Sequence, residues 1–107
     1  MSNEISQLIL VVTVSYNGAV GFGDLFDCEI ERVLTGVINE PRIRISILAS
    51  DKDTLQFILA HLHPKKLKIG FTLHKRGEPY KLSPISGFVD RSNTSWKIDF
   101  VEEAEEQ

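Results

Sequence analysis

Cysteine is almost absent from this chain, and this and other absences narrow what the protein can be. Cys28 is the one cysteine among 107 residues, which excludes an intrachain disulfide and a cysteine-rich metal site. The longest apolar run, residues 8–14, is interrupted by Thr13 and is far too short to span a bilayer. The first seven residues contain Glu4 but no Lys or Arg, so we expect no secretory leader. We therefore expect a soluble, cytoplasmic protein with no membrane partner.

The composition is that of an ordinary globular protein. Hydrophobic residues make up 42% of the chain and charged residues 25%, and the length suffices to bury a core without metals or disulfides. We predict one domain over residues 1–107, with its core at about residues 5–101. The tail, residues 102–107, contains four of the 15 acidic residues and is predicted to be flexible.

Most of the chain has the pattern of β-strands. Residues 5–16 are rich in β-branched side chains and predict a long strand, followed by a glycine-rich loop at residues 17–23. From residue 25 onward, apolar and acidic side chains alternate, which predicts a half-buried strand with an acidic outer face. Arg32 interrupts the inward row, so this residue lies near a barrel mouth or the register shifts there. The inward row is Phe26, Cys28, Ile30 and Leu34.

The next two elements are a short strand and a helix. In residues 42–48 three isoleucines face inward and Arg44 faces outward, where we expect it to lie opposite Glu31 in a hairpin. A capping pattern of Ser50 and Asp53 begins the predicted helix, and Pro64 ends it. The helix has an apolar stripe that we expect to be buried, consisting of Leu55, Ile58, Leu59 and Leu62.

The remaining segments complete a mainly β fold. Residues 66–74 alternate strictly, residues 85–90 predict a short strand, and residues 95–101 predict a last strand. The last strand has one apolar face, formed by Trp96, Ile98 and Phe100. We predict a small antiparallel β-barrel of five to six strands with one α-helix. The helix between the third and fourth strands resembles the element order of the OB-fold, a five-stranded Greek-key barrel, and the resemblance is one of topology alone.

No residues form a recognisable catalytic or metal-binding pattern, so we expect no enzyme activity, cofactor or metal. His61, His63 and His74 lack the spacing that would aim them at one ion. Cys28 lies in an apolar row and is expected to be buried and inert. The glycines of residues 18–23 precede a strand and no lysine follows them, unlike phosphate-binding loops.

Acidic residues on one strand face form the first candidate site. Asp27, Glu29 and Glu31 are spaced two residues apart, which suits cation binding or acid–base hydrolysis. We favour the alternative, a solvated face balanced by Arg42 and Arg44.

A basic segment, residues 65–81, forms the second candidate site. It contains six of the 12 basic residues and one acidic residue. In barrels with this element order, the loop after the fourth strand borders the face that binds oligonucleotides, and Tyr80 could stack on a base. The candidate partner-binding residues are Lys66, Lys68, Lys75, Arg76, Tyr80 and Lys81.

We therefore expect a non-catalytic binding or protein–protein interaction module. Its partner would be another protein or a second copy of the chain, since charged faces of opposite sign and exposed strand edges suit such contacts. The alternative is single-stranded oligonucleotide binding through residues 65–81, which the net charge of −3 disfavours. A small hydrolase that uses Asp27 and Glu29 ranks last.

Overall fold

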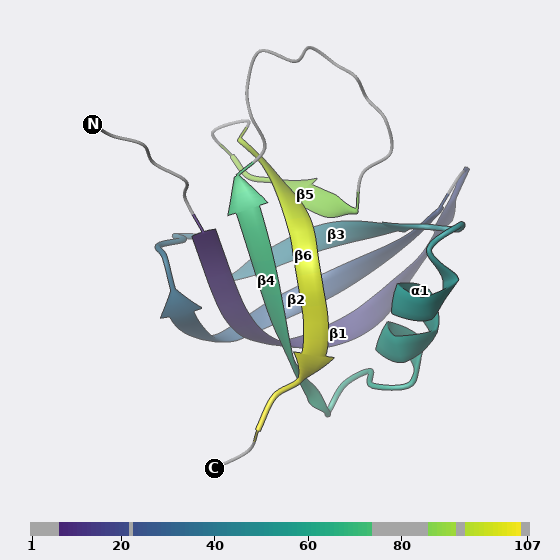
Figure 1. Cartoon of the computed structure of the whole chain (residues 1–107), viewed down its shortest axis with the longest axis horizontal. Coiled ribbons are helices and arrows are strands. Elements are labelled where there is room, and N and C mark those ends of the chain that lie inside the picture. The colour runs from purple at the N-terminus through teal and green to yellow at the C-terminus, as the bar shows by residue number, and fades with distance from the viewer. Residues whose placement is uncertain (1–6, 22, 74–85, 92–93, 106–107) are drawn as a thin grey trace.

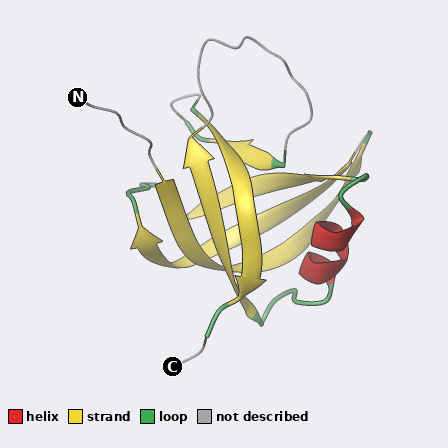
Figure 2. Ribbon diagram, viewed as in Figure 1, coloured by secondary structure: helices red, strands yellow, loops and turns green. Residues whose placement is uncertain are grey.

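The structure, a computed structural model, describes residues 7–21, 23–73, 86–91 and 94–105. These residues form six strands and one short helix with their connections. The strands close into an antiparallel barrel in the order β1-β2-β3-β5-β6-β4, and the helix connects β3 to β4 (Figure 1; Figure 2). The predicted barrel with one helix between its third and fourth strands is confirmed. The elements are β1 (Gln7–Val20), β2 (Gly23–Thr35), β3 (Arg42–Leu48), α1 (Lys52–Leu59), β4 (Lys66–Leu73), β5 (Gly87–Val89) and β6 (Ser95–Glu103).

The apolar run at residues 8–14 becomes the first half of β1, which pairs with β2 on one side and β4 on the other. Its inward side chains, among them Leu8 and Leu10, join the hydrophobic core. Val11 faces outward and is still only 3% exposed, because it stands between Arg32 of β2 and Lys68 of β4. This half of β1 is thus covered on both faces, which explains why its sequence is a continuous apolar run rather than an alternating one.

The glycine-rich stretch is part of a hairpin, and the loop predicted at residues 17–23 is wrong. β1 runs to Val20 and β2 begins at Gly23, so little chain is left between them. Gly18 has a φ of +128°, and the pairing with β2 shifts by one residue between Tyr16 and Gly18. The glycine at 18 therefore serves a bulge inside the strand, a conformation that disfavours other residues.

A second irregularity changes the phase of β2 after Ile30. Val12 pairs with Ile30 and Val11 with Arg32, so the register shifts at the position where Arg32 interrupts the predicted row. This shift was one of the two predicted alternatives. Leu34, predicted to face inward, is 45% exposed, because the alternation does not continue through the irregularity.

β3 has the predicted phase but not the predicted partner for its arginine. Ile43, Ile45 and Ile47 are buried in the core. Arg44 pairs with Asp27 across the hairpin, so the prediction that it faces Glu31 is wrong. The connection from β2 to β3 occupies residues 36–41, and this length sets the register four residues away from the predicted one.

Helix α1 is shorter than predicted, and one residue of its predicted buried stripe is exposed. Asp51, not Ser50, is the N-cap, and its side chain accepts a hydrogen bond from the amide of Thr54. The helix ends at Leu59, five residues before Pro64.

The buried face of α1 includes Ile58, with Leu55 and Leu62 partly buried beside it. Leu59, predicted to be buried, is 43% exposed. Phe57 also packs against the core, which turns the buried face away from Leu59.

The last strand also changes phase. Phe71 pairs with Ile98 but Gly70 pairs with Phe100, so one residue of β6 is extra. Phe100 was predicted to share the inward face of Ile98 and is instead 37% exposed, with its ring over Gly70. Val101 packs against the core in its place.

Strand β6 continues into the acidic tail. β6 continues to Glu103, and the amide of Ala104 donates to the carbonyl of Lys66 at 3.1 Å. Residues 102 and 103 of the predicted tail therefore belong to β6. Glu102 forms an ion pair with Lys68, and the Oε2 atom of Glu103 lies 3.1 Å from Nε2 of His61.

Candidate interaction site

The basic segment is only partly within the described residues. Lys66 and Lys68 lie on β4, whereas the other predicted site residues, Lys75, Arg76, Tyr80 and Lys81, lie outside the described part of the chain. The Nζ atom of Lys68 is 3.2 Å from the Oε2 atom of Glu102 on the neighbouring β6. One of the two described lysines thus forms an ion pair with an acidic side chain of a neighbouring strand.

The pairing of the strands mixes the charges around these two lysines. One row across the sheet contains Glu102, Lys68 and Arg32, and the next contains Lys66, Glu29 and Arg42. Each row holds both signs of charge. The described part of the predicted basic segment is therefore a surface of mixed charge, which weakens its attraction for a polyanion.

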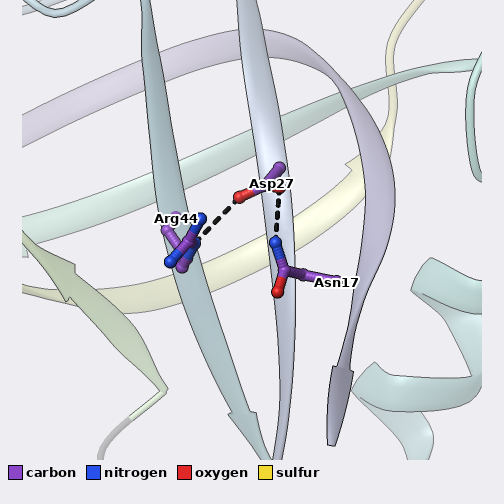
Figure 3. Close-up of polar contacts among 3 residues, drawn as sticks. All are labelled: Asn17, Asp27 and Arg44. Atoms are coloured by element: carbon purple, nitrogen blue, oxygen red, sulfur yellow. Dashed lines mark hydrogen bonds and ion pairs between the residues drawn. The ribbon is translucent and has the colours of Figure 1, made fainter.

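On the acidic face of β2, side chains of the neighbouring strands likewise contact the acidic residues. Figure 3 shows Asp27 between two side chains, Arg44 of β3 and Asn17 of β1. Arg44 Nε donates to Oδ1 at 2.9 Å, and Asn17 Nδ2 donates to Oδ2 at 2.6 Å. These hydrogen bonds, first the one from Arg44 and then the one from Asn17, lower the pKa of Asp27. A carboxyl group that donates a proton near neutral pH needs the opposite shift.

The other two acids of this face lie beside polar or basic residues. The Thr13 hydroxyl donates to Glu31 at 3.2 Å, and Glu29 stands opposite Arg42 of β3. Among the described residues, no group of three or more His, Cys, Asp or Glu side chains could hold a metal ion. The arrangement favours a solvated charged face over a paired catalytic site.

The described histidines lie in different surroundings. The His61 ring lies between the carbonyl of Phe57, 2.8 Å from Nδ1, and Glu103, 3.1 Å from Nε2. His63 contacts β1 through its backbone amide, which donates to Val14. His74 lies outside the described residues.

Cys28 is buried, as predicted, with 0% of its surface exposed. Burial, and secondarily the charge of Asp27, raise the pKa of its thiol to about 12. The thiolate, which is the nucleophilic form, is therefore rare at neutral pH.

A cleft of about 410 Å³ lies where the connection between β2 and β3 meets the turn between β5 and β6. Arg91 and Glu40 form an ion pair within this lining, with 3.4 Å between Nε and Oε2. The Asp90 carboxylate accepts a hydrogen bond from the Thr94 amide. The charged groups of the cleft thus serve the local structure. Its lining is Val37, Ile38, Asn39, Glu40, Pro41, Asp90 and Arg91.

The far half of β1 forms an open strand edge. β4 pairs with β1 from Gln7 to Thr13, and the amide of His63 then donates to the Val14 carbonyl at 2.8 Å. Beyond that point, in residues 15–20, β1 continues with β2 as its partner, and no strand of the described chain pairs with its other side. This end of the β1–β2 hairpin projects past the start of β4 (Figure 1).

The open edge at residues 15–20 is exposed and carries no charge. All six residues are exposed except Gly18, which is partly buried. The stretch contains no charged residue and no proline, the two features with which proteins commonly protect an edge strand.

The end of β2 differs from this edge. Within the described chain, residues 31–35 also have no strand on the β3 side, but the connection to β3 must run back beside them, since the amide of Ile30 donates to the Pro41 carbonyl at 3.1 Å. Glu31 and Arg32 add charges there. The edge of β1 is therefore the better candidate for strand pairing.

From the sequence alone, residues 15–20 were predicted to form the end of a strand and part of a loop. Two signals were available: a glycine within a strand pattern is typical of a bulge, and Asn17 continues the polar side of the alternation. The exposure of one side of β1 depends on where β4 begins, at Lys66, and no local pattern reveals that.

No protein-family model, curated protein or solved structure matches this chain. In the described part of the chain, no helix is long and apolar enough to cross a membrane.

Proposed function

We propose that this protein is a non-catalytic interaction module that binds an extended segment of another protein along residues 15–20 of β1. The observation that carries the proposal is the uncharged, exposed edge of β1 past its last pair with β4. An edge of this kind presents a row of backbone N–H and C=O groups to which a further strand can bond.

The chemistry of the other candidate sites supports a binding role. The hydrogen bonds from Arg44 and Asn17 lower the pKa of Asp27, and the Cys28 thiol has a pKa of about 12. Neither group suits proton transfer or nucleophilic attack at neutral pH. Oligonucleotide binding through residues 65–81 stays a prediction, and the pairing of Lys68 with Glu102 gives it less support.

The test is a capture experiment with edge variants. The tagged protein captures partners from a native lysate, and the double variant Ser15→Lys/Ala19→Lys places two positive charges on the edge. Gln7→Lys/Thr35→Lys adds the same charge to exposed positions at the opposite end of the β1–β2 hairpin. We expect a partner that the wild type and the Gln7/Thr35 variant retain and the edge variant loses. Equal retention by both variants would contradict the proposal.

A further inference from the structure

The open edge of β1 contains a gap in its side chains. Gly18 lies in the middle of residues 15–20, and apart from Gly18 itself and its two chain neighbours, no described heavy atom lies within 4 Å of the position that a Cβ atom would occupy there. Across the hairpin, Gly18 pairs with Leu25 of β2, so the two residues share one face of the sheet. Leu25 is partly exposed on this face, away from the core, and no side chain from Gly18 covers it.

The acidic side chain nearest to Leu25 on this face of β2 is already paired with a basic one. Asp27, two residues from Leu25 on the same face of β2, has Arg44 at 2.9 Å and Asn17 at 2.6 Å. On the other face, the hydroxyl of Tyr16 donates to Asp24 at 3.0 Å. On the face that Gly18 shares with Leu25, a charged side chain would find Asp27 already paired with Arg44, whereas an apolar one would find the side chain of Leu25.

We infer that the partner segment carries a large apolar side chain, best an aromatic one, which lies over Gly18 and against Leu25. This inference rests on the proposed strand addition to β1. An added strand would place one residue beside Gly18, where a ring can cover the glycine backbone and contact the side chain of Leu25. The gap would thereby select among extended segments that make the same backbone hydrogen bonds.

The test uses two probe peptides of eight residues, alternating threonine and valine, with either Phe or Ala at one central position. Each is titrated into ¹⁵N-labelled protein, and the amide signals of residues 15–20 report binding. We expect both peptides to shift these signals and the Phe peptide to bind about 3–10-fold more tightly, the usual range for an aromatic cross-strand contact.

Three variants assign the preference to the gap. Leu25→Ala should bring the affinities of the Phe and Ala peptides together, while Leu25→Met, which keeps an apolar side chain there, should preserve the difference. Leu34→Ala removes the same side chain from an exposed position near the far end of β2 and should also preserve it. The amide spectrum of each variant shows whether it is folded.

The outcomes separate the inference from the proposed function. Equal binding of the two peptides at residues 15–20, or a preference that survives Leu25→Ala, would overturn the inference and leave strand addition standing. Failure of both peptides to shift residues 15–20 would overturn strand addition and the inference with it.

Discussion

At the scale of single residues, Cys28 reports most simply on the interior of the barrel. Its thiol is buried and has a pKa of about 12, so the folded protein should react slowly with a thiol reagent at neutral pH. Adding denaturant should make labelling fast. Rapid labelling of the native protein would contradict both the burial and the phase of β2.

The same thiol should make the folded protein less stable at high pH. The pKa of Cys28 is about 12 in the folded protein, against an ordinary value of 9.0. Its contribution to stability is therefore fully present below pH 9 and is lost as the pH rises toward 12. Denaturant unfolding between pH 8 and about 11 should show this decline for the wild type and a smaller one for Cys28→Ala.

Two adjacent helix residues should differ sharply in their effect on stability. Ile58 is fully buried, so Ile58→Ala should lower the free energy of unfolding by about 2–5 kcal/mol. Leu59 is 43% exposed, and Leu59→Ala should cost less than about 1 kcal/mol. Urea unfolding measures both free energies. A loss for Leu59→Ala as large as that for Ile58→Ala would show that Leu59 is buried, as the sequence predicted.

Asp27 tests the polar contacts on the outer face of β2. The hydrogen bond from Arg44 is the largest cause of its lowered pKa, so Arg44→Met should raise the pKa of Asp27 toward the ordinary value of 3.8. A lowered pKa contributes stability above pH 3.8 that is lost as the pH falls through the folded-state value. Since the side chains of Arg44 and Asp27 are 60% and 38% exposed, we expect less than about 1 kcal/mol. An NMR titration in which Arg44→Met leaves the pKa unchanged would contradict the assignment.

At the scale of elements, simple alternation predicted the structure where strands pair regularly. The inward rows of β3 and β4, such as Ile45 and Ile69, are buried as predicted. In β2 and β6 the same reasoning failed after Ile30 and Ile98, because each strand shifts register there. A register shift inserts a residue and exchanges the two faces, and apolar residues occur on both sides of it.

The open edge at residues 15–20 could likewise be predicted only in part from local sequence patterns. The sequence led us to expect exposed strand edges but not their place, and its glycines suggested a loop where the structure has a bulged hairpin. Gly18 and Gly21 both have positive φ values, which suit a loop and a bulged hairpin equally well. Which side of β1 stays open is decided by the start of β4, some 50 residues further along the chain than residues 15–20.

The strand β4 is also the element on which nucleic-acid binding would depend. With Lys68 beside Glu102 and acidic residues in both charge rows, we expect no measurable binding of single-stranded oligonucleotides at physiological salt. A gel shift at micromolar protein in about 150 mM salt checks this. A shift that Lys66→Glu/Lys68→Glu abolishes, and whose affinity falls with a slope near −0.7 per neutralised phosphate, would contradict it.

At the scale of the whole molecule, the barrel holds one hydrophobic core, and one end of its longest hairpin projects beyond the paired sheet (Figure 2). The net charge of −3 is small, and the described outer face alternates in sign. Long-range electrostatic attraction would therefore contribute little to finding a partner, and contact at the open edge would decide specificity.

Amide hydrogen exchange, measured on the protein alone and with its captured partner, tests the role of this edge most directly. In the free protein, the backbone amides of residues 15–20 that point away from β2 should exchange quickly, since no described strand covers them. An added strand should slow these amides by at least about tenfold while leaving those of residues 31–35 unchanged. Unchanged exchange at residues 15–20 in a saturated complex, with protection elsewhere on the barrel, would contradict the proposed function.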